Sequence, residues 1–216
     1  MMGYQLTTWV LPVLLCLVFH ELAHGYVAYL LGDRTAYRAG RLTLDPKAHI
    51  DVIGTIALPV LLFVSGSHTL FGWAKPVPVN PVHFKHPRRG MGLVALAGPL
   101  MNIILALGVA WGARGIFALF PNGFPMADWV ILNVKNLVSL SFLLAAFNLL
   151  PVLPLDGGRV VAALLPKKWA YSYQQTERYG MWILLGILFV FPLLGIDLVG
   201  AFIRLFYPLF TFLLGM

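Results

Sequence analysis

Hydrophobic residues along this chain gather in long runs that are separated by short polar stretches. Five runs approach the roughly 20 mostly apolar residues that a bilayer-spanning helix needs. They are residues 6–31, 92–118, 130–153, 178–194 and 197–215. A sixth run, 50–66, is shorter and contains Pro59. The pattern predicts an all-α polytopic membrane protein with five or six transmembrane helices.

Composition agrees with this interpretation, because 60% of the residues are hydrophobic and only 11% are charged, against about 25% in an ordinary soluble domain. The net charge of +7 does not favour a nucleic-acid partner, since the basic residues lie in loops rather than in a basic helix. Residues 1–19 contain no Lys or Arg, so a secretory signal peptide is not expected. The single cysteine, Cys16, excludes an internal disulfide and a thiolate metal cage. We expect one membrane domain over residues 1–216.

The basic residues also indicate direction. Loops 32–49, 67–91 and 154–178 each hold four Lys or Arg, and the remaining three are Arg114, Lys135 and Arg204. The three loops share one side only if 50–66 makes no net crossing, so we expect a short re-entrant helix/strand element after the first helix. The positive-inside rule makes that side cytoplasmic. The first run and 130–153 then both run toward the cytoplasm.

Ionisable residues interrupt the first apolar run, where they are costly and persist mainly for function. His20 and His24 are four residues apart, so on a helix they project from the same face and can bind one cation. Glu21 lies beside them. HExxH on a helix is the arrangement of two zinc ligands and a carboxylate that takes a proton from water. The alternative is a pair of core histidines bonded to neighbouring helices.

A catalytic zinc site usually has three protein ligands, and Asp156 is the best candidate for the third. It follows an apolar run that descends in the same direction as the first, and glycines 157 and 158 let the backbone turn closely around a ligand. An Asp before Gly-Gly is also typical of a simple turn or a helix cap. The remaining histidines, at positions 49, 68, 83 and 86, lie in or beside loops and are better interpreted as interfacial polar groups.

Three motifs occur in one order: "HELAH" at 20–24, "AGPLMN" at 97–102 and "NLLPVLPLDGG" at 148–158. Together they resemble the site-two protease family of intramembrane zinc metalloproteases, whose signatures are HExxH and NxxPxxxLDG. "FGWAKPVPVNP" at 71–81 is similar to the small prokaryotic branch that lacks appended sensor domains. The resemblance covers nearly the whole chain.

This resemblance implies one Zn2+ per chain, held by His20, His24 and Asp156, with Glu21 as the catalytic general base. It implies that Asn148 binds substrate backbone, although an interhelical hydrogen bond is an equal alternative for an Asn in a membrane. Asn102 is expected to be a packing residue or a support for a ligand.

The implied activity is hydrolysis of peptide bonds in or near transmembrane segments of membrane proteins. The enzyme is expected in a prokaryotic cell membrane, with its active site reached from the cytoplasm. "GRLTL" at 40–44 and "KPVPV" at 75–79 are expected to form a strand and an extended edge that pairs with substrate, or else a re-entrant plug. A metal-ion transporter or a non-catalytic scaffold using the same His/Asp cluster remains the alternative. Oligomeric state leaves no signal in the sequence.

Overall fold

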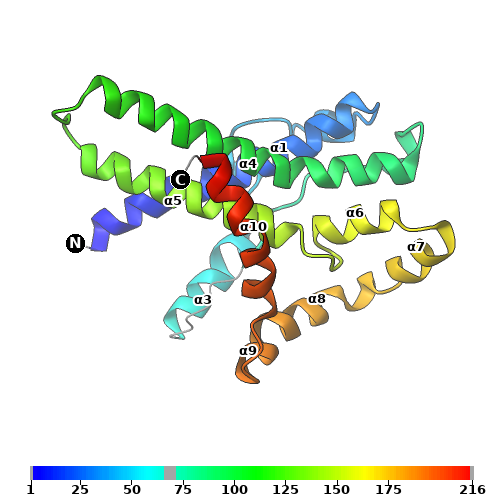
Figure 1. Cartoon of the computed structure of the whole chain (residues 1–216). Coiled ribbons are helices and arrows are strands. Elements are labelled where there is room, and N and C mark those ends of the chain that lie inside the picture. Colours follow the sequence, from blue (N-terminus) through cyan, green and yellow to red (C-terminus); the bar gives the residue numbers. More distant parts are fainter. Residues whose placement is uncertain (1, 66–71, 215–216) are drawn as a thin grey trace.

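Three long helices form the centre of the molecule in the computed structural model, which describes residues 2–65 and 72–214 (Figure 1). They are α1 (Met2–Leu30), α4 (Pro87–Leu119) and α5 (Ala127–Asn148). All three are long and apolar enough to cross a membrane. α1 and α5 run in the same direction and α4 runs against them (Figure 1), as the sequence predicted for the first and third of these segments.

Small side chains let these helices approach each other closely. Ala28, Gly98, Ala106 and Ala145 are buried on the facing surfaces, which is the usual means of packing where lipid offers no hydrophobic driving force between helices. Cys16 is fully buried and its Sγ lies 3.0 Å from Ser141 Oγ on α5. The cysteine therefore faces a helix and contributes to packing.

The region after α1 contains only short elements: α2 (Thr35–Arg38), η1 (Pro46–Ala48), the π-helical η2 (Val52–Ala57), α3 (Leu58–Val64) and η3 (Pro81–His83). η2 and α3 form one apolar helical stretch that is too short to qualify as a membrane span. The helical part of the expected element is therefore present. Its re-entrant path stays a prediction.

The strand part of that expectation is wrong for the described residues, which contain no β-strand. Residues 40–44, expected to form the strand, make a turn and bends, and residues 75–79, the expected edge, have no regular secondary structure. Pro76 and Pro78 lack the N–H groups that a ladder requires, and side chains hold the segment instead. Arg41 Nη2 donates to the carbonyls of Lys75 at 2.8 Å and Pro76 at 3.3 Å.

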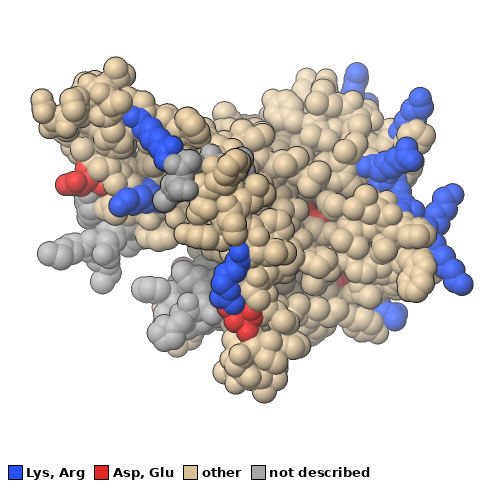
Figure 2. Space-filling model, viewed as in Figure 1, with Lys and Arg blue, Asp and Glu red and all other residues tan. Residues whose placement is uncertain are grey.

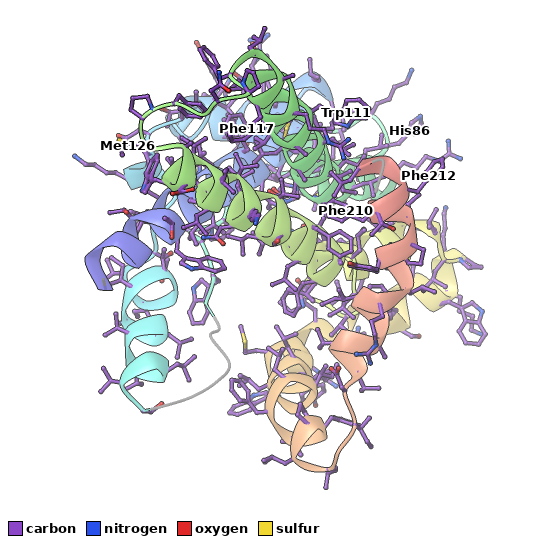
Figure 3. The ribbon with its side chains drawn as sticks, turned by 60° about the vertical axis from the view of Figure 1, so that its left-hand side comes forward. His86, Trp111, Phe117, Met126, Phe210 and Phe212 are labelled. Carbon is purple, nitrogen blue, oxygen red and sulfur yellow. The ribbon has the colours of Figure 1, made fainter. Side chains whose placement is uncertain are left out.

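The C-terminal part is made of shorter helices. They are α6 (Asp156–Leu164), α7 (Lys167–Gln174), α8 (Glu177–Leu185), η4 (Gly186–Val190), α9 (Phe191–Leu193) and α10 (Leu198–Leu214). α10 returns to the bundle, where Phe210 stacks on Phe142 of α5 with ring centroids 4.1 Å apart (Figure 3).

Fewer of the described helices qualify as membrane spans than the sequence predicted. Three described helices meet the length and composition of a span, and a fourth does so if the pair Lys167–Gln174 and Glu177–Leu193, bent by 59°, counts as one. The all-helical class is confirmed, whereas five or six spans are not. The segment predicted at 178–194 includes the π-helical η4 and Pro192, and Leu198–Phe212 is a short apolar helix.

Basic side chains collect at one end of the bundle. The C-terminal end of α1, the start of α4 and the α6–α7 region lie together at the right of Figure 1, whereas the N-terminus and the α4–α5 connection lie at the left. Most of the Lys and Arg side chains visible in Figure 2 lie at that right-hand end. The described basic residues therefore gather toward one end of the bundle, and the absence of a net crossing by 50–66 stays a prediction.

Candidate metal centre

Two imidazoles on α1 begin the site. His20 and His24 are one helical turn apart, and their Nε2 atoms are separated by 3.0 Å. His20 is buried at 7% exposure, and only 11% of the His24 side chain is accessible. Two nitrogen atoms this close need a shared proton or a shared cation between them.

Asp156 brings the third ligand atom from α6. It lies in the first turn of that helix, and its Oδ2 is 3.2 Å from His20 Nε2 and 3.4 Å from His24 Nε2. A tetrahedral site with bonds of about 2.0–2.1 Å has ligand–ligand edges of about 3.3 Å, so the three distances between ligand atoms match one face of such a site. Within the described residues, Asp156 Oδ2 is buried without a hydrogen bond. The donor set therefore fits a zinc ion.

Charge at Asp156 suits metal binding as well. Burial raises the pKa of this carboxyl, but the adjacent His20 and His24 outweigh that effect and hold the pKa well below its usual range. The carboxylate is therefore ionised at neutral pH, which is the form that binds a cation.

The other ring nitrogens of the two histidines contact α4. His24 Nδ1 lies 2.7 Å from the Val94 carbonyl, so Nδ1 carries the proton and Nε2 keeps its lone pair for a metal. Asn102 is fully buried, and its Nδ2 lies 3.2 Å from His20 Nδ1, while its Oδ1 has no partner among the described residues. The two amide atoms are nearly equal in size and are assigned from their hydrogen bonds, and a half-turn of the amide lets Oδ1 accept from His20 Nδ1–H. That orientation satisfies the orphaned oxygen and frees His20 Nε2.

Glycines explain how three backbones come so close. A Cβ on Gly98 of α4 would lie 2.5 Å from His24 Nε2 and 2.6 Å from His20 Cε1. A Cβ on Gly157 would meet the Leu149 carbonyl, and one on Gly158 would lie 2.6 Å from Leu153 N. The glycines after Asp156 therefore let α6 start directly against the end of α5, rather than curving around a ligand as the sequence suggested.

Glu21 lies beside the cluster. One of its carboxylate oxygens, Oε2, accepts a hydrogen bond of 2.9 Å from the backbone N–H of Val77. Glu21, the two histidines and Asp156 line a cavity of about 170 Å³. Pro76, Val77, Val79 and Arg159 also line it, and these four residues continue into a larger groove of about 640 Å³. The cavity and the groove therefore adjoin along these four residues.

Asn148 lines the same cavity as the metal cluster. Its Nδ2 donates to the Leu144 carbonyl one turn back in α5, at 3.0 Å, so its recorded bond lies within its own helix rather than between helices. The other described histidines make contacts outside the cluster or face solvent. His49 is buried on the Thr43 carbonyl, His83 bonds Asp33, and His86 is exposed before α4. His68 lies outside the described residues.

Two contributors were missed by reasoning from the sequence. The Val77 N–H and the Val94 carbonyl are backbone groups, which no residue type reveals. Gly98 carried a usable signal, because Gly followed by Pro inside a long apolar run indicates close approach of another chain segment.

The chain belongs to Peptidase family M50, the site-2 protease family, whose model matches residues 8–193. Curated relatives agree. "Putative zinc metalloprotease YwhC" of Bacillus subtilis is 42% identical over 193 residues, covering 85% of this chain and 80% of the relative. "Putative zinc metalloprotease Rip2" of Mycobacterium tuberculosis is 30% identical over 197 residues, covering 91% and 70%. "Zinc metalloprotease MJ0392" of Methanocaldococcus jannaschii is 32% identical over 124 residues, covering 56% and 34%. No solved structure matches the chain significantly.

Proposed function

We propose that this protein is an intramembrane zinc metalloprotease that hydrolyses peptide bonds in or near transmembrane segments of membrane proteins. One observation carries the proposal: ligand atoms of His20, His24 and Asp156 converge within 4.8 Å of one another, with Glu21 beside them and apolar helices around them. Membership of Peptidase family M50 and the names of the relatives support zinc as the metal.

The proposed chemistry is a hydrolysis. Bound at this site, zinc would lower the pKa of a water ligand to about 7. Glu21 would accept the proton of that water and return it to the leaving amine. Asn148 lines the same cavity, and we assign to it a contact with the substrate backbone near the scissile bond.

Substrate would reach the site along the groove that adjoins the cavity. Residues of segment 75–79 line one side of the groove. A substrate lying beside this segment would regain the backbone hydrogen bonds that the substrate loses when its own helix unwinds. The groove lies with the basic loops, so the positive-inside rule supports access from the cytoplasm. A prokaryotic cell membrane is the location that we propose.

The decisive experiment separates the base from the ligands. Glu21→Gln should keep zinc content near one ion per chain and abolish cleavage of a transmembrane substrate. Asp156→Ala and His20→Ala should lose zinc, as measured by metal analysis of the protein purified in detergent. Asp45→Asn, a change to an exposed loop carboxylate, serves as the control and should keep both zinc and activity.

Full proteolysis by Glu21→Gln would remove Glu21 from the mechanism, and unchanged zinc in Asp156→Ala would disqualify it as a ligand. The same preparations test the two alternatives. Zinc uptake into proteoliposomes without proteolysis would favour a metal-ion transporter, and zinc binding with neither activity would favour a scaffold.

A further inference from the structure

Asp33 follows the end of α1 and is a fully buried carboxylate, with 0% exposure. Its Oδ1 accepts from the backbone and hydroxyl of Thr35, both local contacts. The more distant partners lie across the loop: Asn80 N–H donates to Oδ2 at 2.6 Å, and His83 Nδ1 lies 2.7 Å from Oδ1. Asp33 therefore ties residues 80–83 to the end of α1.

These residues belong to the stretch whose Val77 N–H bonds Glu21, 2.9 Å away. Val77 and Asn80 are only three positions apart, and Pro76, Pro78 and Pro81 lie among and beside them. Proline holds φ near −65°, so this short run has few free torsions and a displacement at Asn80 moves Val77 as well. Arg41, bonded to the Lys75 and Pro76 carbonyls, fixes the other end.

Two carboxylates, Glu21 on α1 and Asp33 just after it, thus hold the proline-rich segment, residues 75–83. Glu21 lies beside the metal cluster, and Asp33 lies twelve residues further along the chain. We propose that Asp33 is a positioning residue for Glu21: by anchoring Asn80 and His83 it holds the Val77 N–H in place, and that N–H orients the Glu21 carboxylate. A carboxylate has two oxygens, so Oε2 can be held by Val77 while Oε1 serves the reaction. This inference rests on the proposed function in that Glu21 is the base to be oriented.

Amide hydrogen exchange tests the coupling without any substrate. Pro76 and Pro78 have no N–H, so Val77 and Val79 carry all the amides between Lys75 and Asn80, and peptide-level mass spectrometry isolates them. We expect Asp33→Asn, which keeps the shape but replaces one acceptor oxygen with an NH2 group and removes the charge, to raise exchange at Val77 by about tenfold or more through local opening. His83→Ala, which removes a half-exposed partner, should raise it less. Asp45→Asn should leave it unchanged.

Kinetics then distinguish positioning from general destabilisation. Asp33→Asn should lower kcat for a transmembrane substrate by about tenfold to a hundredfold, the range that a misplaced catalytic group costs, with KM within about twofold and zinc content unchanged. Val77→Pro removes the N–H from this proline-rich run and should reproduce the loss of kcat. Val77→Ala shortens the side chain but keeps the N–H, so its kcat should fall clearly less than that of Val77→Pro.

The proposal is overturned if the Val77 amide exchanges at the wild-type rate in folded Asp33→Asn. It is also overturned if Val77→Pro and Val77→Ala have the same kcat. If Asp33→Asn does not fold, unchanged exchange at Val77 in His83→Ala overturns it instead. These outcomes differ from failure of the proposed function, which Glu21→Gln reports through cleavage and which leaves the exchange result untouched.

Discussion

Replacing Gly98 with alanine should weaken zinc binding, although the change adds only one methyl group. The added Cβ would lie 2.5 Å from His24 Nε2 and 2.6 Å from His20 Cε1, whereas ordinary contact begins at 3.4 Å. The rings or α4 must therefore move by about 0.9 Å, and a metal site tolerates changes of about 0.2 Å in its ligand distances. His20 and His24 cannot both keep their present positions relative to Asp156.

We expect the zinc affinity of Gly98→Ala to fall by at least the 10- to 100-fold that is typical when support of a metal ligand is lost. Competition with a chelator of known affinity, on protein in detergent, measures this directly. Gly108→Ala on the same helix is the matched control, because no atom lies within 4 Å of its new Cβ. Alanine there should stabilise the helix slightly and leave zinc binding intact. Wild-type zinc affinity in Gly98→Ala would refute the view that α4 packs directly on the ligands.

Three further changes test other parts of the structure. Asn102→Ala should weaken zinc binding by about 10- to 100-fold in the same chelator assay, because His20 Nδ1 loses its partner; unchanged affinity would show that the amide does not orient the ring. Gly157→Ala should sharply reduce folded yield, since its Cβ would meet the Leu149 carbonyl; a normal melting temperature would contradict this. Burial raises the pKa of Asp33, but hydrogen bonds from Thr35, Asn80 and His83 outweigh it and lower the pKa from 3.8 to about 2. The ionised carboxylate therefore adds about 2 kcal/mol of stability above pH 4 that is lost as pH falls toward 2. The difference in unfolding free energy between wild type and Asp33→Asn should shrink by that amount on acidification, and a constant difference would refute it.

The length of the apolar runs predicted the long helices well. α1, α4 and α5 fall where the long apolar runs 6–31, 92–118 and 130–153 predicted them, because each run is about as long as the bilayer is thick. The later runs were harder to interpret. Residues 178–194 are as apolar as a span, but hydropathy does not record the π-helical turns of η4, the bend of 59° or the short length of α10. Hydropathy measures the environment that a segment prefers, not whether its backbone stays straight.

Only the side-chain contributions to the candidate site could be predicted from the sequence. Spacing placed His20 and His24 on one face, and the shared direction of two runs suggested Asp156, which the structure brings to within 3.4 Å of both. No side-chain pattern could predict that Val77 bonds Glu21 through its backbone, 56 positions away. The edge expected at 75–79 forms no ladder for a related reason: its prolines are compatible with an edge strand, but in the structure they stiffen a segment that Arg41 and Asp33 hold.

Register between α1 and α4 accounts for the order of the motifs. Val94, Gly98 and Asn102 are spaced by four residues and so occupy one face of α4, just as His20 and His24 occupy one face of α1. Because the two helices are antiparallel, the later histidine meets the earlier residue: His24 contacts Val94, and His20 contacts Asn102. Gly98 lies between them, where an added Cβ would collide with both rings.

A slip of one helical turn, about 6 Å for four residues, would break both contacts at once. It would also replace Gly98, which has no side chain, with a residue whose side chain would lie against the imidazoles. α4 therefore sets the tautomer, the spacing and the depth of the two histidines together. This explains why "AGPLMN" accompanies "HELAH": the first motif supplies Asn102 to His20 Nδ1 and Gly98 for the close approach of the two rings, while Val94, one turn before Gly98, contacts His24 Nδ1.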